Sequence, residues 1–524
     1  MVLYSNLDRI GARDSSKNGM RSKILLNRVS FRIKQFLSVL LFLVIIGWNK
    51  QQETKITVEF PDQPEVNTLI YTVPISGTTY IHFSDTLKAS ETGKFELNLN
   101  ITQPSFVSIR VDGQTNRIKL LVEQGNNYRV SIDPHKNVQI KGANEKGQMF
   151  YTTLPEPFFV EMELRNMGFN PFNPNDTMSF AYIHHKINEL KQSDMSKFKE
   201  LLDDNEITKS FFEFVQKDRD LYYASLEARF LIIKLSISTR LGIKVDDELL
   251  ENLKKIYDQY PPGDENLLFS SFWPEYAIYH IEDYQQNFLN FNDKFQDLRR
   301  AGTYYTHVVI NESKKYLSGK ALEFFQARFI HFRSMQPRSI SEREWILLFE
   351  QFEKDYPYSE YSKYLKPNID KIINYHRVIK QQSQVMTFMD NYENVNTLEE
   401  AIKPLQGKKI YIDVWATWCG PCLIEFAHNE GLKKILAEND IQQLYISIDK
   451  DDDDQKWKNM IKYYNLTGTQ IRANEEFRSN LAKLFSEKNP QLAIPWYILI
   501  DEQGNIIEKH AKRPSQLVAG EKLW

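Results

Sequence analysis

The segment Tyr411–Cys422, YIDVWATWCGPC, holds the only two cysteines in a chain of 524 residues. This pair constrains the chain more than any other feature, because no other thiol is present to pair with either member. Two cysteines are too few for the disulfide framework of so large a protein. They are also too few for a zinc site built from thiolates alone. The spacing favours a redox-active pair, with a zinc site and a buried structural disulfide as the alternatives.

The residues around the pair place the first cysteine where a thiolate is stabilised. The run YIDVWA predicts a buried strand that ends just before Cys419, and CLIEFAHNEGLKKILAEN predicts the helix that follows. Cys419 then lies at a helix N-terminus, where unpaired N–H groups and the helix dipole favour negative charge. Pro421 suits the first turn, because its missing N–H is not needed there. We expect Cys419 to attack a substrate disulfide and Cys422, further inside, to resolve the mixed disulfide.

From Val395 onward, predicted strands and helices alternate. IQQLYISID predicts a second strand, and PWYILID and NIIEKHA predict a hairpin joined by EQG. This order is typical of a thioredoxin-like fold. Asp413 lies on an otherwise apolar strand, and because burying an unpaired carboxylate is unfavourable, the position calls for a function. Pro495 within a strand-like run is explained by a cis bond before the strand.

The C-terminal residues 391–524 resemble the thioredoxin superfamily, most specifically through WCGPC at Trp418–Cys422. Asp413 occupies the position of the family's buried aspartate, which the resemblance implies takes the proton of the second thiol. The segment Ile494–Asp501, IPWYILID, matches the family's cis-proline segment. The resemblance implies that Pro495 faces the cysteines and that the backbone of Ile494 meets a bound peptide.

Glu425, three residues after Cys422, matches the CxxCxxE pattern of exported, membrane-tethered oxidoreductases of the TlpA/ResA type. The resemblance implies that this glutamate tunes thiol acidity, although a glutamate on the helix surface is the alternative. The family usually has a proline two residues later, where this chain has Ala427, so the shape of the helix is open at this point. The resemblance also implies substrate contacts from three residues beside the cysteines: Trp418, Gly420 and Pro421.

The N-terminal residues 1–53 predict a signal peptide or membrane anchor. Five basic residues and no acid lie between Arg21 and Lys34, ahead of the apolar run Phe36–Trp48. The run is shorter than the roughly 20 residues that span a bilayer. A buried helix in a cytosolic protein is the alternative. An export signal places the rest of the chain in the cell envelope, periplasmic or anchored to the cytoplasmic membrane.

The region between the signal and the cysteine domain predicts two further parts. Residues 54–145 alternate apolar and polar residues between turn signals, which predicts an all-β, sandwich-like domain. Residues 146–390 show apolar residues at three- and four-residue intervals, which predicts a helical domain. The order of exported segment, β domain, helical middle and thioredoxin-like domain resembles large TlpA-like envelope proteins of bacteria.

Charge and composition exclude other classes. The net charge is −3, and no basic stripe with interleaved aromatics indicates nucleic-acid binding. The acidic run Lys450–Asp454 lacks the spacing of a calcium loop and predicts a solvated loop. No metal site and no cofactor is predicted.

Together these features predict an envelope thiol–disulfide oxidoreductase that acts as a reductant on protein disulfides through Cys419 and Cys422. A membrane-embedded thiol reductant is the expected electron donor. An alternative is a binding or scaffold protein whose N-terminal domains carry the main role. Oxidase or isomerase activity changes only the direction of exchange, because the potential depends on how strongly the Cys419 thiolate is stabilised.

Overall fold

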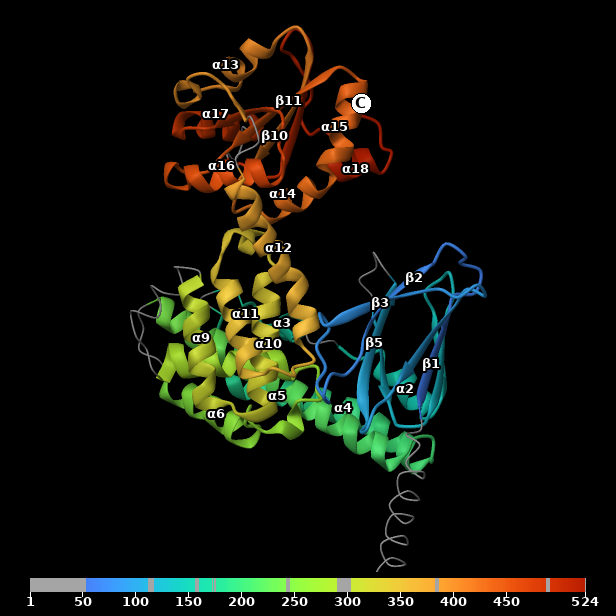
Figure 1. Cartoon of the computed structure of the whole chain (residues 1–524). Helices are drawn as coiled ribbons and strands as arrows, with labels where there is room; N and C mark the ends of the chain where they lie inside the picture. Colours follow the sequence, from blue (N-terminus) through green and yellow to red (C-terminus); the bar gives the residue numbers. More distant parts are fainter. Residues whose placement is uncertain are drawn as a thin grey trace, which may run out of the picture.

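The computed structural model arranges the described part of the chain in three regions (Figure 1). The described residues are 53–111, 117–155, 160–171, 173, 176–241, 246–289, 303–381, 386–486 and 491–523. The predicted signal or anchor, Phe36–Trp48, lies outside them. Within these ranges, no helix has both the length and the apolar character needed to cross a membrane.

The first region consists of eight strands in two four-stranded sheets. One sheet has the order β4 (Lys94–Leu99), β1 (Thr54–Glu59), β7 (Asn127–Ile132) and β8 (Val138–Gly142). The other has the order β3 (Ser84–Lys88), β2 (Thr68–Thr72), β5 (Ser105–Val111) and β6 (Ile118–Val122). Burial alternates along β1 and β4, as expected of strands with one face toward a core. Apolar residues of both sheets share that core, among them Ile56, Leu69 and Val107.

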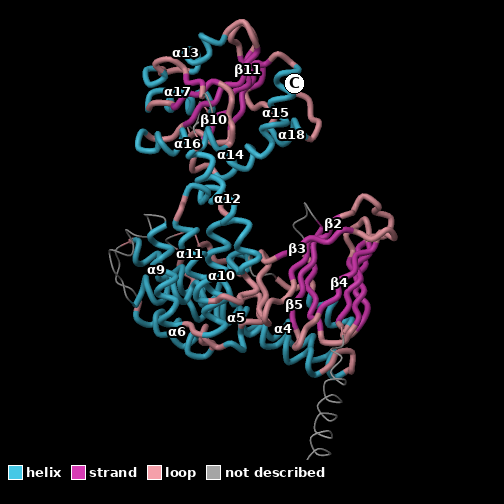
Figure 2. Tube along the Cα trace, in the orientation of Figure 1, coloured by secondary structure: helices cyan, strands magenta, loops and turns pink. Residues whose placement is uncertain are grey.

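The second region is helical (Figure 2). Its longer helices are α4 (Phe180–Asp203), α5 (Lys209–Arg240), α6 (Asp247–Gln259), α9 (Thr303–Tyr316), α10 (Gly319–Ser334), α11 (Glu344–Asp355) and α12 (Ser362–Lys380). The shorter elements are α2 (Glu145–Tyr151), α3 (Val160–Asn166), η2 (Glu265–Leu267), α7 (Trp273–Ile278), the π-helix η3 (Tyr279–Leu289) and η4 (Pro337–Ser341). Side-chain caps fix several starts, since Thr208 accepts a hydrogen bond from the N–H of Phe211 at the start of α5.

The third region has the thioredoxin-like order of elements. Its sheet has the order β14 (Ile506–Glu508), β13 (Trp496–Ile500), β10 (Lys409–Trp415), β11 (Ile441–Ser447), β12 (Thr469–Arg472) and β9 (Thr387–Phe388). β13 is antiparallel to β10 and to β14, whereas β10, β11, β12 and β9 run parallel. Its helical elements are η5 (Tyr392–Asn394), α13 (Leu398–Ile402), η6 (Lys403–Leu405), α14 (Gly420–Glu425), η7 (Phe426–His428), α15 (Asn429–Glu438), η8 (Asp451–Asp453), α16 (Asp454–Tyr463), α17 (Glu475–Phe485) and α18 (Pro514–Val518).

Helices cover both faces of this sheet. Tyr411 of β10 packs in one cluster with residues of α15 and α18. Ile412, which points to the opposite face, shares a cluster with Trp457 of α16 and Phe477 of α17. The helical middle and the thioredoxin-like C-terminal region confirm the predicted multidomain architecture in outline.

Candidate active site

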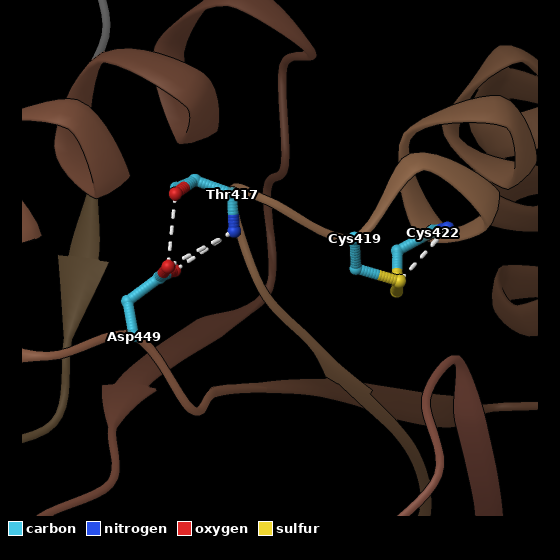
Figure 3. The surroundings of a disulfide bond; sticks show 4 residues. All are labelled: Thr417, Cys419, Cys422 and Asp449. Carbon is cyan, nitrogen blue, oxygen red and sulfur yellow. Dashed lines mark hydrogen bonds between the residues drawn. A yellow bond between two sulfur atoms is a disulfide. The ribbon is translucent and has the colours of Figure 1, made fainter. Parts of the chain in front are cut away.

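The cysteine pair lies at the point where strand β10 passes into helix α14. β10 ends at Trp415, and Cys419 is the N-cap residue of α14. The two cysteines form a disulfide with their Cα atoms 5.3 Å apart (Figure 3). The backbone N–H of Cys422 donates to Cys419 Sγ at 3.2 Å. Since that N–H is one of the free donors of the first helical turn, it also suits a Cys419 thiolate.

The turn ahead of Cys419 is held by a carboxylate that the sequence analysis did not single out. The N–H of Thr417 donates to Asp449 Oδ2 at 2.9 Å, and the Thr417 hydroxyl donates to Oδ1 at 2.8 Å (Figure 3). The Ser447 hydroxyl donates to Asp449 Oδ2 at 2.7 Å. Burial raises the pKa of Asp449 above its ordinary value, although these hydrogen bonds act in the opposite direction. Asp449 therefore positions the segment that carries Cys419.

Asp449 had a signal in the sequence. It lies two residues after the end of β11, and β11 runs parallel to β10. The carboxyl ends of neighbouring parallel strands meet at one edge of a sheet, so an acid after one strand reaches the turn after the other. The adjoining acidic run Lys450–Asp454 predicted a solvated loop, and Asp449 was not distinguished from it.

Asp413 lies within the sheet, with 1% of its surface exposed. Its direct neighbours across the strands are Tyr445 of β11 and Tyr497 of β13. Asp413 Oδ1 has no hydrogen-bond partner among the described residues. Burial raises the pKa of Asp413 well above its ordinary value, and the negative charge of Glu425 raises it further. Such a carboxyl group holds a proton at pH values where an exposed aspartate has lost it.

Glu425 is the last residue of α14 and is buried. Ser515, in α18, holds both of its carboxylate oxygens. The Ser515 N–H donates to Oε2 at 2.9 Å, and the Ser515 hydroxyl donates to Oε1 at 3.0 Å. The alternative that Glu425 is an exposed residue on the helix surface is therefore wrong, because its side chain points inward against α18. The sequence analysis did not anticipate Ser515.

The helix that carries the cysteines is interrupted directly after Glu425. α14 gives way to the 3-10 helix η7, which contains Ala427, before α15 begins. The interruption forms with Ala427 at the position where the resemblance implied a proline. Asn429, the first residue of α15, is buried and accepts a hydrogen bond from the Tyr445 hydroxyl at 2.9 Å. This contact fixes the start of α15 against β11.

The remaining predicted site residues lie beside the cysteines in the chain or at the same edge of the sheet. Trp418 is 53% exposed, Pro421 is exposed, and Gly420 is half-buried. The Ile494–Pro495 peptide bond is cis. β13 begins just after it, and Trp496 of β13 pairs with Val414 near the end of β10. Pro495 therefore lies at the same edge of the sheet as the turn that leads to Cys419.

The described residues contain no group of three or more histidine, cysteine, aspartate or glutamate side chains placed to hold a metal ion. A dithiol at the start of a helix, a buried acid on the preceding strand and a cis-proline at the same sheet edge define a thioredoxin-like thiol–disulfide oxidoreductase domain.

Known proteins are similar to the C-terminal part of this chain. The Redoxin family model matches residues 387–518. The thiol-disulfide oxidoreductase ResA of one Bacillus cereus strain is 27% identical over 115 residues, which cover 21% of this chain and 57% of that protein. ResA of Bacillus anthracis is 32% identical over 65 residues, which cover 12% and 36%. The matches thus span 57% of the length of the first of these curated relatives and 36% of the second. Its C-terminal domain is similar to TlpA/ResA-like proteins of the thioredoxin superfamily.

Among solved structures, a thiol-disulfide oxidoreductase from Bacteroides fragilis NCTC 9343 is similar to this chain. The identity is 25%, the match covers 21% of this chain and 77% of that one, and the TM-score is 0.18.

Proposed function

We propose that this chain is a thiol–disulfide oxidoreductase of the cell envelope that reduces disulfides in other proteins. The observation that carries the proposal is the position of Cys419, an N-cap residue whose sulfur accepts the Cys422 N–H at 3.2 Å. The buried Asp413 on the preceding strand, whose Oδ1 has no hydrogen-bond partner among the described residues, supports it. The ResA relatives carry the name thiol-disulfide oxidoreductase, which supports the same reaction class.

The reaction has two exchange steps. The Cys419 thiolate attacks one sulfur of the substrate disulfide, that disulfide breaks, and the second substrate sulfur leaves as a thiolate. Cys422 then passes its proton to Asp413 and attacks the sulfur of Cys419. The Cys419–Cys422 bond forms, the mixed disulfide breaks, and the remaining substrate sulfur leaves as a thiolate. Two electrons have passed from the dithiol to the substrate.

Asp413 and Glu425 have distinct roles in this proposal. The raised pKa of Asp413 makes its carboxylate a good proton acceptor for a thiol. Glu425 reinforces that basicity through its negative charge, which Ser515 holds in place with two hydrogen bonds. Trp418, Gly420, Pro421, Ile494 and Pro495 form the proposed substrate-contact surface.

The location and the electron donor are part of the proposal. The basic flank and apolar run Phe36–Trp48 support export and anchoring at the cytoplasmic membrane. A membrane-embedded thiol reductant would return the Cys419–Cys422 disulfide to the dithiol. The Gly-Pro pair between the cysteines favours the reducing direction by resemblance. The β and helical regions would orient the substrate relative to the membrane.

The first experiment is the reduction potential of the Cys419–Cys422 pair. The purified protein is equilibrated in defined dithiol/disulfide buffers, and free thiols are trapped by alkylation. A value near or below about −250 mV, close to thioredoxin, supports a reductant. A value of about −120 to −180 mV, the range of oxidases and isomerases, overturns the proposed direction.

A second experiment tests whether the thiols carry the biological role. A Cys419→Ser, Cys422→Ser double variant is compared with a deletion strain. The proposal expects the variant to behave as the deletion does. Full rescue by the variant would refute the oxidoreductase proposal and favour a scaffold role for the N-terminal regions.

A further inference from the structure

The dithiol site borders the helical middle region. In Figure 1, α14 lies on the side of the thioredoxin-like domain that faces α12 and the helices below it. The contact is made by η4, which lies against α14. A Cβ atom on Gly420, the residue that follows Cys419, would be 3.9 Å from Pro337 Cγ. Pro337 therefore lies close to Gly420, the residue between Cys419 and Pro421, although it belongs to another region of the chain.

The element that carries Pro337 is firmly held. The Ser339 hydroxyl donates to the backbone carbonyl of Arg333 at 2.9 Å, and Ile340 is buried in the helical core. Pro337 itself is the first residue of η4, where its fixed φ is favourable. A segment anchored in this way presents a rigid surface toward α14.

The two regions are also joined beside this contact. The rings of Tyr375 in α12 and Tyr463 in α16 lie 5.1 Å apart. The Lys462 ammonium donates to the backbone carbonyl of Ile379 at 2.9 Å. These contacts hold the thioredoxin-like domain with its cysteine pair turned toward η4.

Exposure around the disulfide is uneven. Cys419 is 4% exposed, whereas Trp418 is 53% exposed and Ile424 is 58% exposed. The apolar side chains of Trp418 and Ile424 are therefore open to solvent, while Cys419 is covered. Disulfide exchange requires direct contact between the attacking sulfur and the substrate sulfur, so access to Cys419 limits the reaction.

We propose that Pro337 is a specificity-determining residue of the dithiol site. Because Pro337 lies next to Gly420, it sterically blocks disulfides on broad, rigid protein surfaces. Cysteines on extended chain segments can still reach Cys419. The inference rests on the proposed function and names its substrate class: protein disulfides in unfolded or extended segments.

The first test measures access to the sulfur without any exchange reaction. In a Cys422→Ser background, Cys419 is the sole thiol of the full-length protein. Its rate constants with N-ethylmaleimide and with a maleimide on a long polyethylene glycol chain are measured, and their ratio is compared with that of a free cysteine peptide. The discrimination is the rate constant with N-ethylmaleimide divided by that with the bulky maleimide. We expect it to be about tenfold larger in the protein than in the peptide, and we expect Pro337→Ala to reduce it at least about threefold.

Two further variants make this test decisive. Pro261→Ala changes an exposed proline in the loop after α6 and should leave the discrimination unchanged. A Lys462→Ala, Tyr463→Ala double variant loosens the contact between the regions and should reduce the discrimination as Pro337→Ala does. Two results would overturn the proposed role of Pro337. One is a ratio of rate constants equal to that of the free peptide, and the other is a ratio that changes in neither the Pro337 variant nor the double variant.

The second test uses exchange and separates this inference from the proposed function. Reduced full-length protein is mixed with a disulfide protein in its folded form and in its denatured form. We expect Pro337→Ala to raise the rate with the folded form about threefold or more and to leave the rate with the denatured form nearly unchanged. If Pro337→Ala is active but the ratio of its rates with the folded and the denatured form equals that of wild type, the role of Pro337 is refuted and the proposed function stands. Absence of exchange with both forms overturns the proposed function, and the specificity with it.

Discussion

Two aspartates of the thioredoxin-like domain, Asp413 and Asp449, are both buried, but their surroundings differ. The oxygens of Asp449 accept hydrogen bonds from Thr417 and Ser447. Asp413 Oδ1 has no partner among the described residues. Burial raises the pKa of both carboxyl groups. Since buried polar groups are nearly always hydrogen-bonded, Asp449 supports the fold, whereas the unpartnered Oδ1 of Asp413 supports the proposal that Asp413 accepts a proton.

The largest effect on stability is expected at Asp449. Asp449→Ala leaves the N–H and hydroxyl of Thr417 and the hydroxyl of Ser447 without their acceptor in a buried place. Each lost hydrogen bond to a charged group is worth about 1.5–3 kcal/mol, so we expect a loss of about 3 kcal/mol or more in the free energy of unfolding. Urea denaturation of the oxidised protein measures it. Asp449→Asn, which keeps an acceptor oxygen, is the control and should lose less; a loss below about 1 kcal/mol for Asp449→Ala would contradict the structural role.

For Asp413 we expect the main effect on the rate of disulfide exchange, whereas for Asp449 it is on stability. Asp413→Asn removes the proton acceptor for Cys422 and keeps the shape of the side chain. General base catalysis contributes about 10²–10⁴-fold, so we expect the resolution of a mixed disulfide to slow at least about 100-fold at neutral pH. Stopped-flow measurement of the mixed-disulfide decay reports this step directly. An unchanged decay rate would show that Asp413 is a structural residue, like Asp449.

The same comparison shows what the sequence could predict. The cysteine pair, the strand and helix on either side of it, the burial of Asp413 and the bond before Pro495 all follow from residues within a short stretch of chain. The hydrogen bonds from Thr417 to Asp449 and from Ser515 to Glu425 join residues 32 and 90 positions apart. Such pairings depend on how strands and helices pack, which local patterns do not specify.

The contact of Pro337 with Gly420 is a still clearer case. It joins two regions of the chain, and neither residue belongs to a pattern that points to the other. The interruption of the helix after Glu425 was also open in the sequence, because the usual proline is replaced by Ala427. Tertiary contacts of Asn429 fix the start of α15 there, where sequence alone offered no helix-breaking residue.

The pH dependence of stability should also distinguish the two aspartates. The folded-state pKa of Asp413 is raised, so the folded protein binds this proton more tightly than the unfolded chain does. The free energy of unfolding therefore falls as the pH rises from about 4, the unfolded pKa, toward the folded pKa, by about 1.4 kcal/mol per unit. Asp413→Asn cannot titrate and lacks this fall.

We thus expect Asp413→Asn to gain about 1 kcal/mol or more on wild type between about pH 4 and pH 7. Urea denaturation at both pH values measures the gain. Equal curves for the two proteins would mean that the carboxyl group titrates normally in the folded state. Asp449→Asn is the matched control. It removes another buried aspartate, one whose hydrogen bonds offset part of the rise in pKa that burial causes.

The smallest effect is expected at Ser515, which acts on Asp413 only through Glu425. Ser515→Ala removes the hydroxyl that donates to Glu425 Oε1 and keeps the backbone donor to Oε2, so the free energy of unfolding should fall by only about 1 kcal/mol. The freed carboxylate is held less firmly near Asp413, and the pH at which mixed-disulfide decay reaches half its maximum should shift downward. A decay profile over pH measures this shift, and Ser515→Thr, which keeps the hydroxyl, should restore the wild-type midpoint. A loss of stability with an unmoved midpoint would mean that Ser515 only anchors α18 to α14, and that the basicity of Asp413 comes from its burial alone.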